Sequence, residues 1–145
     1  MRRITLLLVA SVTILWSCTP KQEKMENRMK EFISGYEAKA IPLYKESALA
    51  SWEANVNGTD EAWARSEKAS VAYVSFYADG EAFAELKELK ASGLVTEPLL
   101  ARQLDLLYNM YLQGQIDTSL ISEQIRMETE ISKKYSNFRA SIDGK

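Results

Sequence analysis

The sequence predicts an all-α protein, and three observations support this fold class. Apolar residues recur at three- and four-residue steps over most of the chain, which is the spacing that forms one apolar stripe along a helix. The 145 residues include only 3 prolines and 6 glycines, which is few for a fold of short strands and turns. Residues suited to begin and end helices stand between the periodic stretches. We therefore expect successive amphipathic helices that pack together.

Residues 1–17 have the pattern of a secretory signal peptide. Arg2 and Arg3 precede a predominantly apolar run at residues 4–16. This run is shorter than the about 20 residues that a helix needs to span a bilayer. A short positive stretch, an apolar stretch and a small-residue exit together predict export of the chain.

The end of that run resembles the cleavage box of bacterial lipoproteins, because Leu15, Ser17 and Cys18 fit its pattern. In such proteins the cysteine becomes the first residue and carries lipid. Cys18 is the only cysteine, and residues 18–24 suit a short tether. The alternatives are an ordinary core cysteine and a signal peptide cut elsewhere. We expect a bacterial envelope lipoprotein, held to a lipid membrane through Cys18, at the outer membrane or its periplasmic face, because no acidic retention signal follows the cysteine.

The first helix should span residues 24–55. Pro42 lies inside it and should kink or interrupt it near residues 37–41. The Asn and Gly residues between Asn55 and Gly58 should end it. Its apolar stripe comprises Met25, Met29, Phe32, Ile33, Tyr36, Ala40, Tyr44, Ala48 and Trp52.

A second helix should begin at a cap formed by Thr59 or Asp60. Gly80 should divide it into segments near residues 60–78 and 81–91. The side chains expected to face inward are Trp63, Val71, Val74, Ala78 and Phe83.

A third helix should begin at the cap residue Thr96, with Pro98 in its first turn, and end at Gly114. Its expected buried face comprises Leu99, Leu100, Leu104, Leu107, Met110 and Tyr111. A fourth helix should open at Asp117 or Thr118. Its apolar positions are Ile121, Ile125, Ile131 and Tyr135.

The last residues change period. Phe138, Ala140 and Ile142 alternate with polar residues, which is strand spacing, and Asp143-Gly144 is a hairpin turn signal. The pattern predicts either an incomplete β-hairpin or a frayed polar tail.

Residues that carry chemistry are scarce. The chain has no histidine, which excludes catalytic triads and most zinc sites. The six glycines are isolated, so no phosphate-binding loop is present. A net charge of −2 offers no basic face for nucleic acid. We predict no catalytic residue, no metal ligand and no cofactor in this chain.

Two sets of side chains remain as site candidates. Glu81, Glu85 and Glu88 with Lys87 and Lys90 have the spacing of a solvated helix face. Aromatic side chains could line a ligand pocket, but their helical spacing favours core packing. They are Tyr36, Tyr44, Trp52 and Trp63, or Tyr73, Phe76 and Tyr77.

Three segments carry a resemblance to a known family. They are LASWEANVNGT at residues 49–59, ARQLDLLYNMY at 101–111, and YSNFRA at 135–140 followed by DGK at 143–145. In this order they are similar to the angiotensin-converting-enzyme family of zinc peptidyl-dipeptidases. Members carry an Ala-x-Trp-x-x-Asn-x-Asn-x-Thr pattern after a tyrosine-rich amphipathic helix.

The resemblance implies that residues 25–145 are the N-terminal helical part of such an enzyme, which forms a lid over a deep cleft. The family's enzymes hold zinc in an H-E-x-x-H helix, often bind chloride, and release dipeptides from the C-termini of peptide substrates. None of those zinc-binding or catalytic residues has a counterpart here, and the unfinished hairpin at Asp143-Gly144 is then a truncation. The alternative is a free-standing helical lipoprotein that acts as a binding or interaction module.

Overall fold

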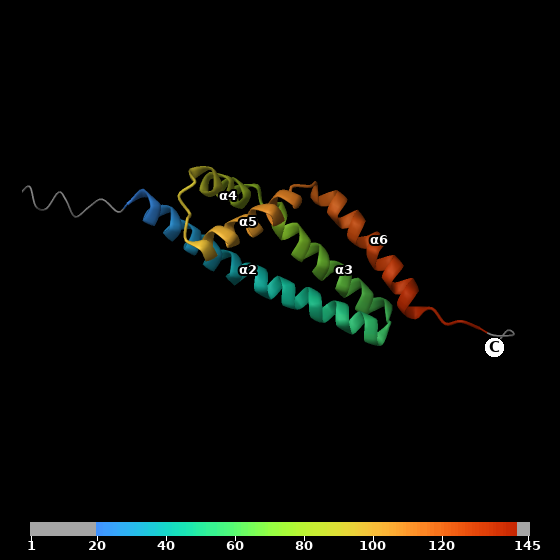
Figure 1. The fold of residues 1–145 in the computed structure, drawn as a ribbon. Helices are drawn as coiled ribbons and strands as arrows, with labels where there is room; N and C mark the ends of the chain where they lie inside the picture. The colour runs from blue at the N-terminus through green and yellow to red at the C-terminus, as the bar shows by residue number, and fades with distance from the viewer. Residues whose placement is uncertain (1–19, 142–145) are drawn as a thin grey trace, which may run out of the picture.

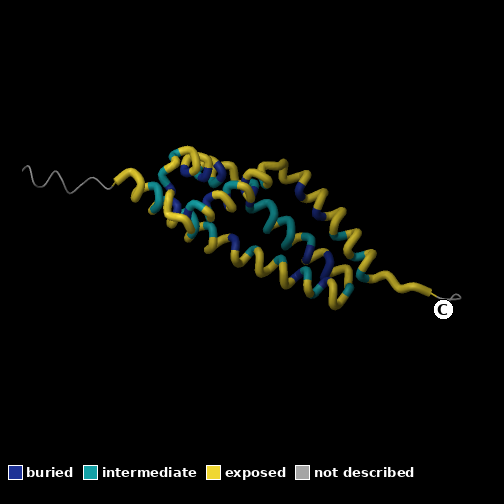
Figure 2. Tube along the Cα trace, viewed as in Figure 1, coloured by how far each residue is buried: buried dark blue, intermediate teal, exposed yellow. Residues whose placement is uncertain are grey.

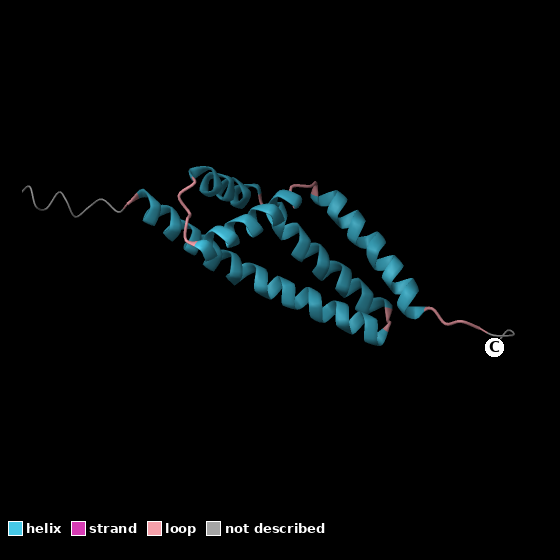
Figure 3. Cartoon of the chain, viewed as in Figure 1, coloured by secondary structure: helices cyan, strands magenta, loops and turns pink. Residues whose placement is uncertain are grey.

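The computed structural model describes residues 20–141, and this part of the chain is all-α, without a strand (Figure 1, Figure 3). Five α-helices and one short 3₁₀ helix follow one another. They are α2 (Lys21–Asn57), α3 (Asp60–Ser75), the 3₁₀ helix η2 (Phe76–Ala78), α4 (Gly80–Ser92), α5 (Pro98–Gln113) and α6 (Thr118–Asn137). The predicted fold class is confirmed.

The helices form an elongated arrangement built on α2 (Figure 1). α3 returns antiparallel along the second half of α2, and α6 packs against the other side of α3. α4 and α5 pack together beside the first half of α2. One end of the molecule therefore holds α4 and α5, and the other holds the ends of α2 and α6 around the start of α3.

Two clusters of buried side chains hold these helices together (Figure 2). The larger lies where α2, η2, α4 and α5 meet. Its buried members are Met29, Tyr77, Phe83, Leu86, Leu89, Val95, Leu100, Leu104, Leu107 and Tyr111. The smaller lies between the end of α2 and the start of α3. It consists of Ala54, Ala62 and Trp63.

The predicted interruption of the first helix is wrong, because α2 continues unbroken through Pro42. Proline removes one backbone hydrogen bond from a helix interior and leaves the carbonyl four residues earlier without its donor. Both Pro42 and Ala38 are exposed, so water can satisfy that carbonyl. α2 also begins at Lys21, so residues 21–24 of the expected tether form its first turn.

The expected ends of the first two helices are confirmed. Gly58 follows α2 with a φ of 67°, which favours glycine. Thr59 caps α3, and its hydroxyl accepts a hydrogen bond from the Ala62 amide at 3.2 Å. The second predicted helix is divided where expected, at η2 and Gly80, and Gly93 ends α4.

The predicted cap of the third helix is wrong, since Glu97 and not Thr96 occupies that position. The Glu97 carboxylate accepts hydrogen bonds from the Leu99 and Leu100 amides at 3.2 and 2.7 Å. Thr96 is held by α2, because its amide donates to Glu26 Oε1 at 3.2 Å. Pro98 in the first turn and Gly114 at the end are confirmed.

Several predicted buried positions are exposed. In the second half of α2 the buried residues are Ala50 and Ala54, whose small side chains allow α3 to approach closely. The larger side chains expected to face inward, Tyr44 and Trp52, are exposed, as is Ala48. Some apolar positions predicted for the third and fourth helices are exposed as well. They are Leu99 and Met110 on α5, and Ile131 and Tyr135 on α6.

The predicted strand at the end of the chain is absent from the described residues. Positions 138–141, including Phe138 and Ala140, are irregular and exposed after α6 ends at Asn137. Ile142 and the Asp143-Gly144 turn signal lie outside residues 20–141, as do the signal peptide at residues 1–17 and Cys18. Within the described helices, none combines the length and the apolar character needed to cross a bilayer.

Candidate functional site

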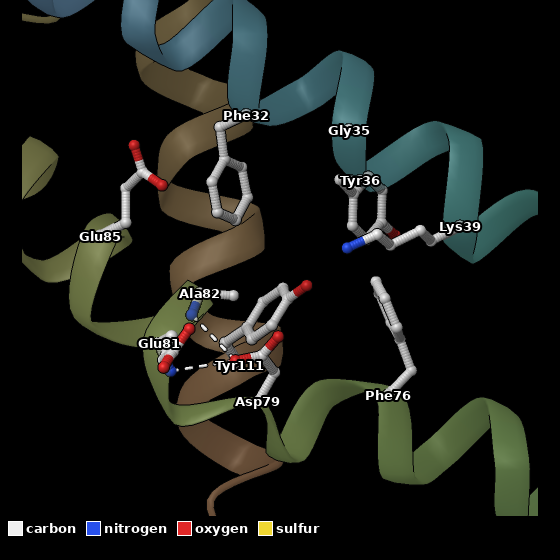
Figure 4. Close-up of a pocket in the computed structure, with 10 residues that line it drawn as sticks. All are labelled: Phe32, Gly35, Tyr36, Lys39, Phe76, Asp79, Glu81, Ala82, Glu85 and Tyr111. Atoms are coloured by element: carbon white, nitrogen blue, oxygen red, sulfur yellow. Dashed lines mark hydrogen bonds between the residues drawn. The ribbon is translucent and has the colours of Figure 1, made fainter.

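A half-open cavity of about 320 Å³ lies between the first half of α2, the junction of η2 with α4, and α5 (Figure 4). It is bordered by residues from all of these elements. They are Phe32, Gly35, Tyr36, Lys39, Phe76, Asp79, Glu81, Ala82, Glu85 and Tyr111. Gly35 and Lys39 are spaced so that α2 directs one turn of its surface toward the cavity.

Aromatic rings form much of the cavity wall. Phe32 and Phe76 each pack edge-to-face with Tyr111, at centroid distances of 6.1 and 6.0 Å. The ring centroids of Tyr36 and Phe76 are 5.9 Å apart. These separations suit attractive aromatic pairs, so the rings stabilise one another and make this part of the wall apolar.

The hydroxyl of Tyr111 is the most unusual polar group of the cavity. The Tyr111 side chain is only 2% exposed, and its hydroxyl points into the cavity without a hydrogen bond to any described residue (Figure 4). Burial, together with the nearby charges of Asp79 and Tyr36, raises the pKa of Tyr111 to about 12. At neutral pH this hydroxyl is therefore protonated and can donate.

Charges of opposite sign border the cavity on different elements. Lys39 of α2 extends its amino group into the cavity (Figure 4). Asp79 caps α4, and its Oδ1 accepts hydrogen bonds from the Glu81 and Ala82 amides at 2.9 and 3.1 Å. Glu85, one turn further along α4, also pairs with Arg28 at 3.4 Å. One wall is thus cationic and the other acidic.

A chain of tyrosine hydroxyls lies behind the cavity. Tyr36 and Tyr73 hydroxyls lie 3.0 and 3.3 Å from the Tyr77 hydroxyl. Burial raises the pKa of Tyr77, and its hydrogen bonds with Tyr36 and Tyr73 raise it further. A phenol that resists ionisation cannot act as a general base near neutral pH.

The cavity combines several kinds of polar and apolar group. Among residues 20–141 no three acidic side chains come together to hold a metal ion. The cavity offers a neutral hydroxyl donor, one ammonium group, carboxylates and aromatic faces, but no nucleophile paired with a base.

A second groove, of about 240 Å³, lies between α2, α3 and α6 and is lined mainly by hydroxyl-bearing residues. Trp63 borders it and is 4% exposed. The indole Nε1 of Trp63 is buried without an acceptor among the described residues. This atom has almost no contact with the space of the groove, so it does not by itself define a binding position.

The aromatic candidates identified in the sequence separate in the structure. Tyr36 and Phe76 line the main cavity, while Tyr44 and Tyr73 pair at 5.6 Å in a neighbouring groove. Trp52 is 72% exposed and lies outside both buried clusters. Tyr77 and Trp63 are buried, as core packing requires.

The charged side of the cavity was not predicted as a site. The acidic face of α4 is largely solvated as expected, yet Glu81 and Glu85 border the cavity. Lys39 and Tyr111 were not singled out as site residues. Lys39 belongs to α2 and Tyr111 to α5, and both border the cavity. The spacing of residues within one helix cannot indicate which residues of another helix will border the same cavity.

Comparison with known proteins gives no relative for this chain. It matches no protein-family model, no curated protein and no solved structure.

Proposed function

We propose that this chain is the N-terminal, cleft-covering region of a membrane-anchored zinc metallopeptidase that releases dipeptides from peptide C-termini. Zinc, and chloride where it is bound, belong to the part of the enzyme that carries the H-E-x-x-H helix. Cys18 provides the lipid anchor that holds the enzyme at the bacterial envelope.

Apolar side chains left exposed along three helices are the observation that carries this proposal. On α2 they include Trp52, on α5 Leu106, and on α6 Ile131 and Tyr135. Large apolar patches on a soluble surface indicate that another surface covers them. A helical region that packs against the body of a larger enzyme requires such faces.

The arrangement of the α6 face illustrates the argument. Its exposed apolar residues recur along one side of the helix. They are Leu120, Met127, Ile131, Tyr135 and, just after the helix, Phe138. Ile121 and Ile125 lie on the adjacent side of the helix, about a quarter to a third of a turn away, and are buried against the rest of the protein. α6 therefore has a broad apolar face that the described residues cover only in part.

Reading the coding DNA beyond codon 145 tests the proposal at little effort. We expect an H-E-x-x-H motif a few hundred residues downstream, in the same or a shifted reading frame. The absence of this motif from every frame would contradict the proposal.

A free-standing helical lipoprotein that binds a partner or ligand is the second candidate, and the cavity beside Tyr111 favours it. This candidate predicts that residues 19–145 remain a monomer at all concentrations. The peptidase proposal predicts self-association, because the exposed apolar faces would cover one another. Sedimentation velocity over a range of concentrations distinguishes the two.

A further inference from the structure

The exposed apolar side chains within α6 form a single stripe along the helix, the α6 stripe. Its members are Leu120, Met127, Ile131 and Tyr135, which are 47–86% exposed, with the polar residue Gln124 between the first two. Successive members are seven, four and four positions apart, so they return to one side of a helix with 3.6 residues per turn. Such spacing is typical of a helix surface that pairs with another helix.

Two opposite charges flank the α6 stripe on the same side of the helix. Glu123 lies four positions before Met127, and Lys134 lies three positions after Ile131. They are eleven positions apart, which is about three helical turns, so both project from that side, about 16 Å apart along the axis. Both are exposed, and neither forms an ion pair with another residue in the described part of the chain.

This distribution of charge favours a second copy of α6 in the antiparallel direction. When two copies of a helix run antiparallel about a two-fold axis, Glu123 of one copy lies opposite Lys134 of the other, and symmetry forms the same pair twice. Met127 of each copy then meets Ile131 of the other. A parallel pair would instead place glutamate against glutamate and lysine against lysine, which is repulsive.

The remaining charges of α6 have partners within the chain. Glu130 pairs with Arg126 at 2.7 Å, and Lys133 pairs with Asp60 at 2.6 Å. Glu128 accepts a hydrogen bond from Gln124 at 2.8 Å and borders the groove between α2, α3 and α6. Figure 1 shows α6 along one edge of the molecule, with α3 on its inner side, so its outer side is accessible to a partner.

We propose that two copies of this chain pair through α6, antiparallel about a two-fold axis, with Glu123 of each copy in an ion pair with Lys134 of the other. Burial of the α6 stripes against each other supplies the affinity. The two exposed ion pairs contribute little affinity and select the direction of the helices. The pairing uses α6 alone and leaves the exposed sides of α2 and α5 to the proposed peptidase, so it does not depend on that proposal.

Crosslinking with a water-soluble carbodiimide tests the pairing. This reagent joins a carboxylate to an amine as an amide, with no spacer, so it acts only where the two groups are in contact. The full chain is produced in bacteria and treated in isolated cell envelopes. We expect a covalent dimer on a denaturing gel, with proteolytic fragments that join Glu123 to Lys134. Absence of a covalent dimer overturns the proposal, and so does joining of these two residues only to other positions or to other proteins.

Charge reversal shows whether the contact lies between two chains. Glu123→Lys alone and Lys134→Glu alone each place like charges opposite one another, so neither variant should form this link with itself. When the two variants are produced together with different tags, opposite charges meet again at both positions. We expect a covalent dimer that contains one copy of each variant, joined between positions 123 and 134. Failure of the two variants to join overturns the proposal.

The variant Ile131→Asn removes the centre of the α6 stripe without adding a group that carbodiimide can join. Leu99→Asn is its matched control, because Leu99 lies on α5 and is 61% exposed, compared with 68% for Ile131. We expect Ile131→Asn to lower the yield of covalent dimer at least about fivefold and Leu99→Asn to leave it unchanged. Any self-association of Ile131→Asn that remains in sedimentation is then due to the other exposed faces. Equal yields of covalent dimer in the two variants overturn the proposal, and circular dichroism checks that both remain helical.

Discussion

Single side chains decide how closely the helices of this protein approach one another. Gly114 ends α5 directly against η2, where an added Cβ would lie 2.5 Å from the Tyr77 carbonyl oxygen. Its φ of −77° is ordinary for any residue, so the close approach and not the backbone conformation requires glycine.

We predict that Gly114→Ala lowers the free energy of unfolding by about 1–3 kcal/mol, because the backbone of η2 must shift to admit a methyl group. Gly35→Ala is the matched control, since nothing lies within 4 Å of its added Cβ and Gly35 stands inside α2. That change should raise the free energy of unfolding by about 0.5–1 kcal/mol. Urea unfolding followed by circular dichroism measures both, and equal effects would contradict the account of Gly114.

A single carboxylate also connects distant parts of the chain. Glu26 of α2 accepts hydrogen bonds from Gln22 at 3.1 Å and from the amides of Thr96 and Glu97 at 3.2 and 3.1 Å. The hydrogen bond from Gln22, then those from the two amides, hold the pKa of Glu26 below its usual range. The loop before α5 is thereby attached to the start of α2.

The lowered pKa of Glu26 predicts a pH dependence of stability. Its contribution is fully present above the pKa of an unfolded glutamate, about 4.3, and is lost as the pH falls through the lower folded pKa. In Glu26→Gln the loss of stability on acidification should therefore be smaller than in the wild type. Glu23→Gln, at an exposed position of the same helix, is the control. Urea midpoints measured between about pH 6 and pH 3 test this, and parallel profiles for Glu26→Gln and the wild type would contradict it.

At the scale of elements, α2 is the helix on which the others assemble. It is unbroken from Lys21 to Asn57 although Pro42 lies in its interior. Proline at such a position costs about 3 kcal/mol relative to alanine when the helix is otherwise retained.

We predict that Pro42→Ala raises the free energy of unfolding by up to about 3 kcal/mol, because it restores one backbone hydrogen bond on an exposed turn of α2. Chemical denaturation monitored by helicity provides the measurement. A decrease in stability would show that the ring of Pro42 has a packing role.

The elements of the fold were largely predictable from the sequence, because their signals are local. Thr59 and Asp117 each cap a helix through a hydrogen bond to an amide within the next three residues. The predicted interruption at Pro42 is wrong, because the effect of a proline inside a helix depends on whether water reaches the carbonyl that loses its hydrogen bond. The cap at Thr96 failed because Glu26, 70 positions earlier, takes its amide.

The buried faces and the cavity were less predictable, since both depend on which helices become neighbours. Trp52 continues the apolar stripe predicted for α2, but α3 packs against a different side of the helix and buries Ala54 instead. Lys39 and Tyr111 border one cavity because α5 packs beside α2. No periodicity within either helix contains that information.

At the scale of the whole molecule, many large apolar side chains of the described helices are exposed, because no other described residue covers them. The exposed side chains belong to α2, α5 and α6, so the surplus is not confined to one patch. The two buried clusters lie near opposite ends of the molecule and leave the outer sides of these helices uncovered (Figure 2). A further layer of protein over these sides would explain the surplus.

Replacing Trp52 and Tyr135 together by lysine should therefore raise the solubility of residues 19–145 while leaving the helical content unchanged. These side chains are 72% and 86% exposed, so their removal disturbs little packing. The double replacement of Asn27 and Ser132, which are exposed polar residues of α2 and α6, by lysine adds the same charge and is the control. Maximum soluble concentration is the measurement, and an equal gain in both proteins would indicate an effect of charge alone.

The central claim is that these helices pack against further protein, and a fluorescent dye that binds apolar surface tests it most directly. The dye is added to folded residues 19–145 at 25 °C, with circular dichroism confirming the helices. We predict strong fluorescence, reduced by the lysine replacements at Trp52 and Tyr135. A fully helical chain that leaves the dye dark would contradict the claim, because its apolar faces would then need no partner.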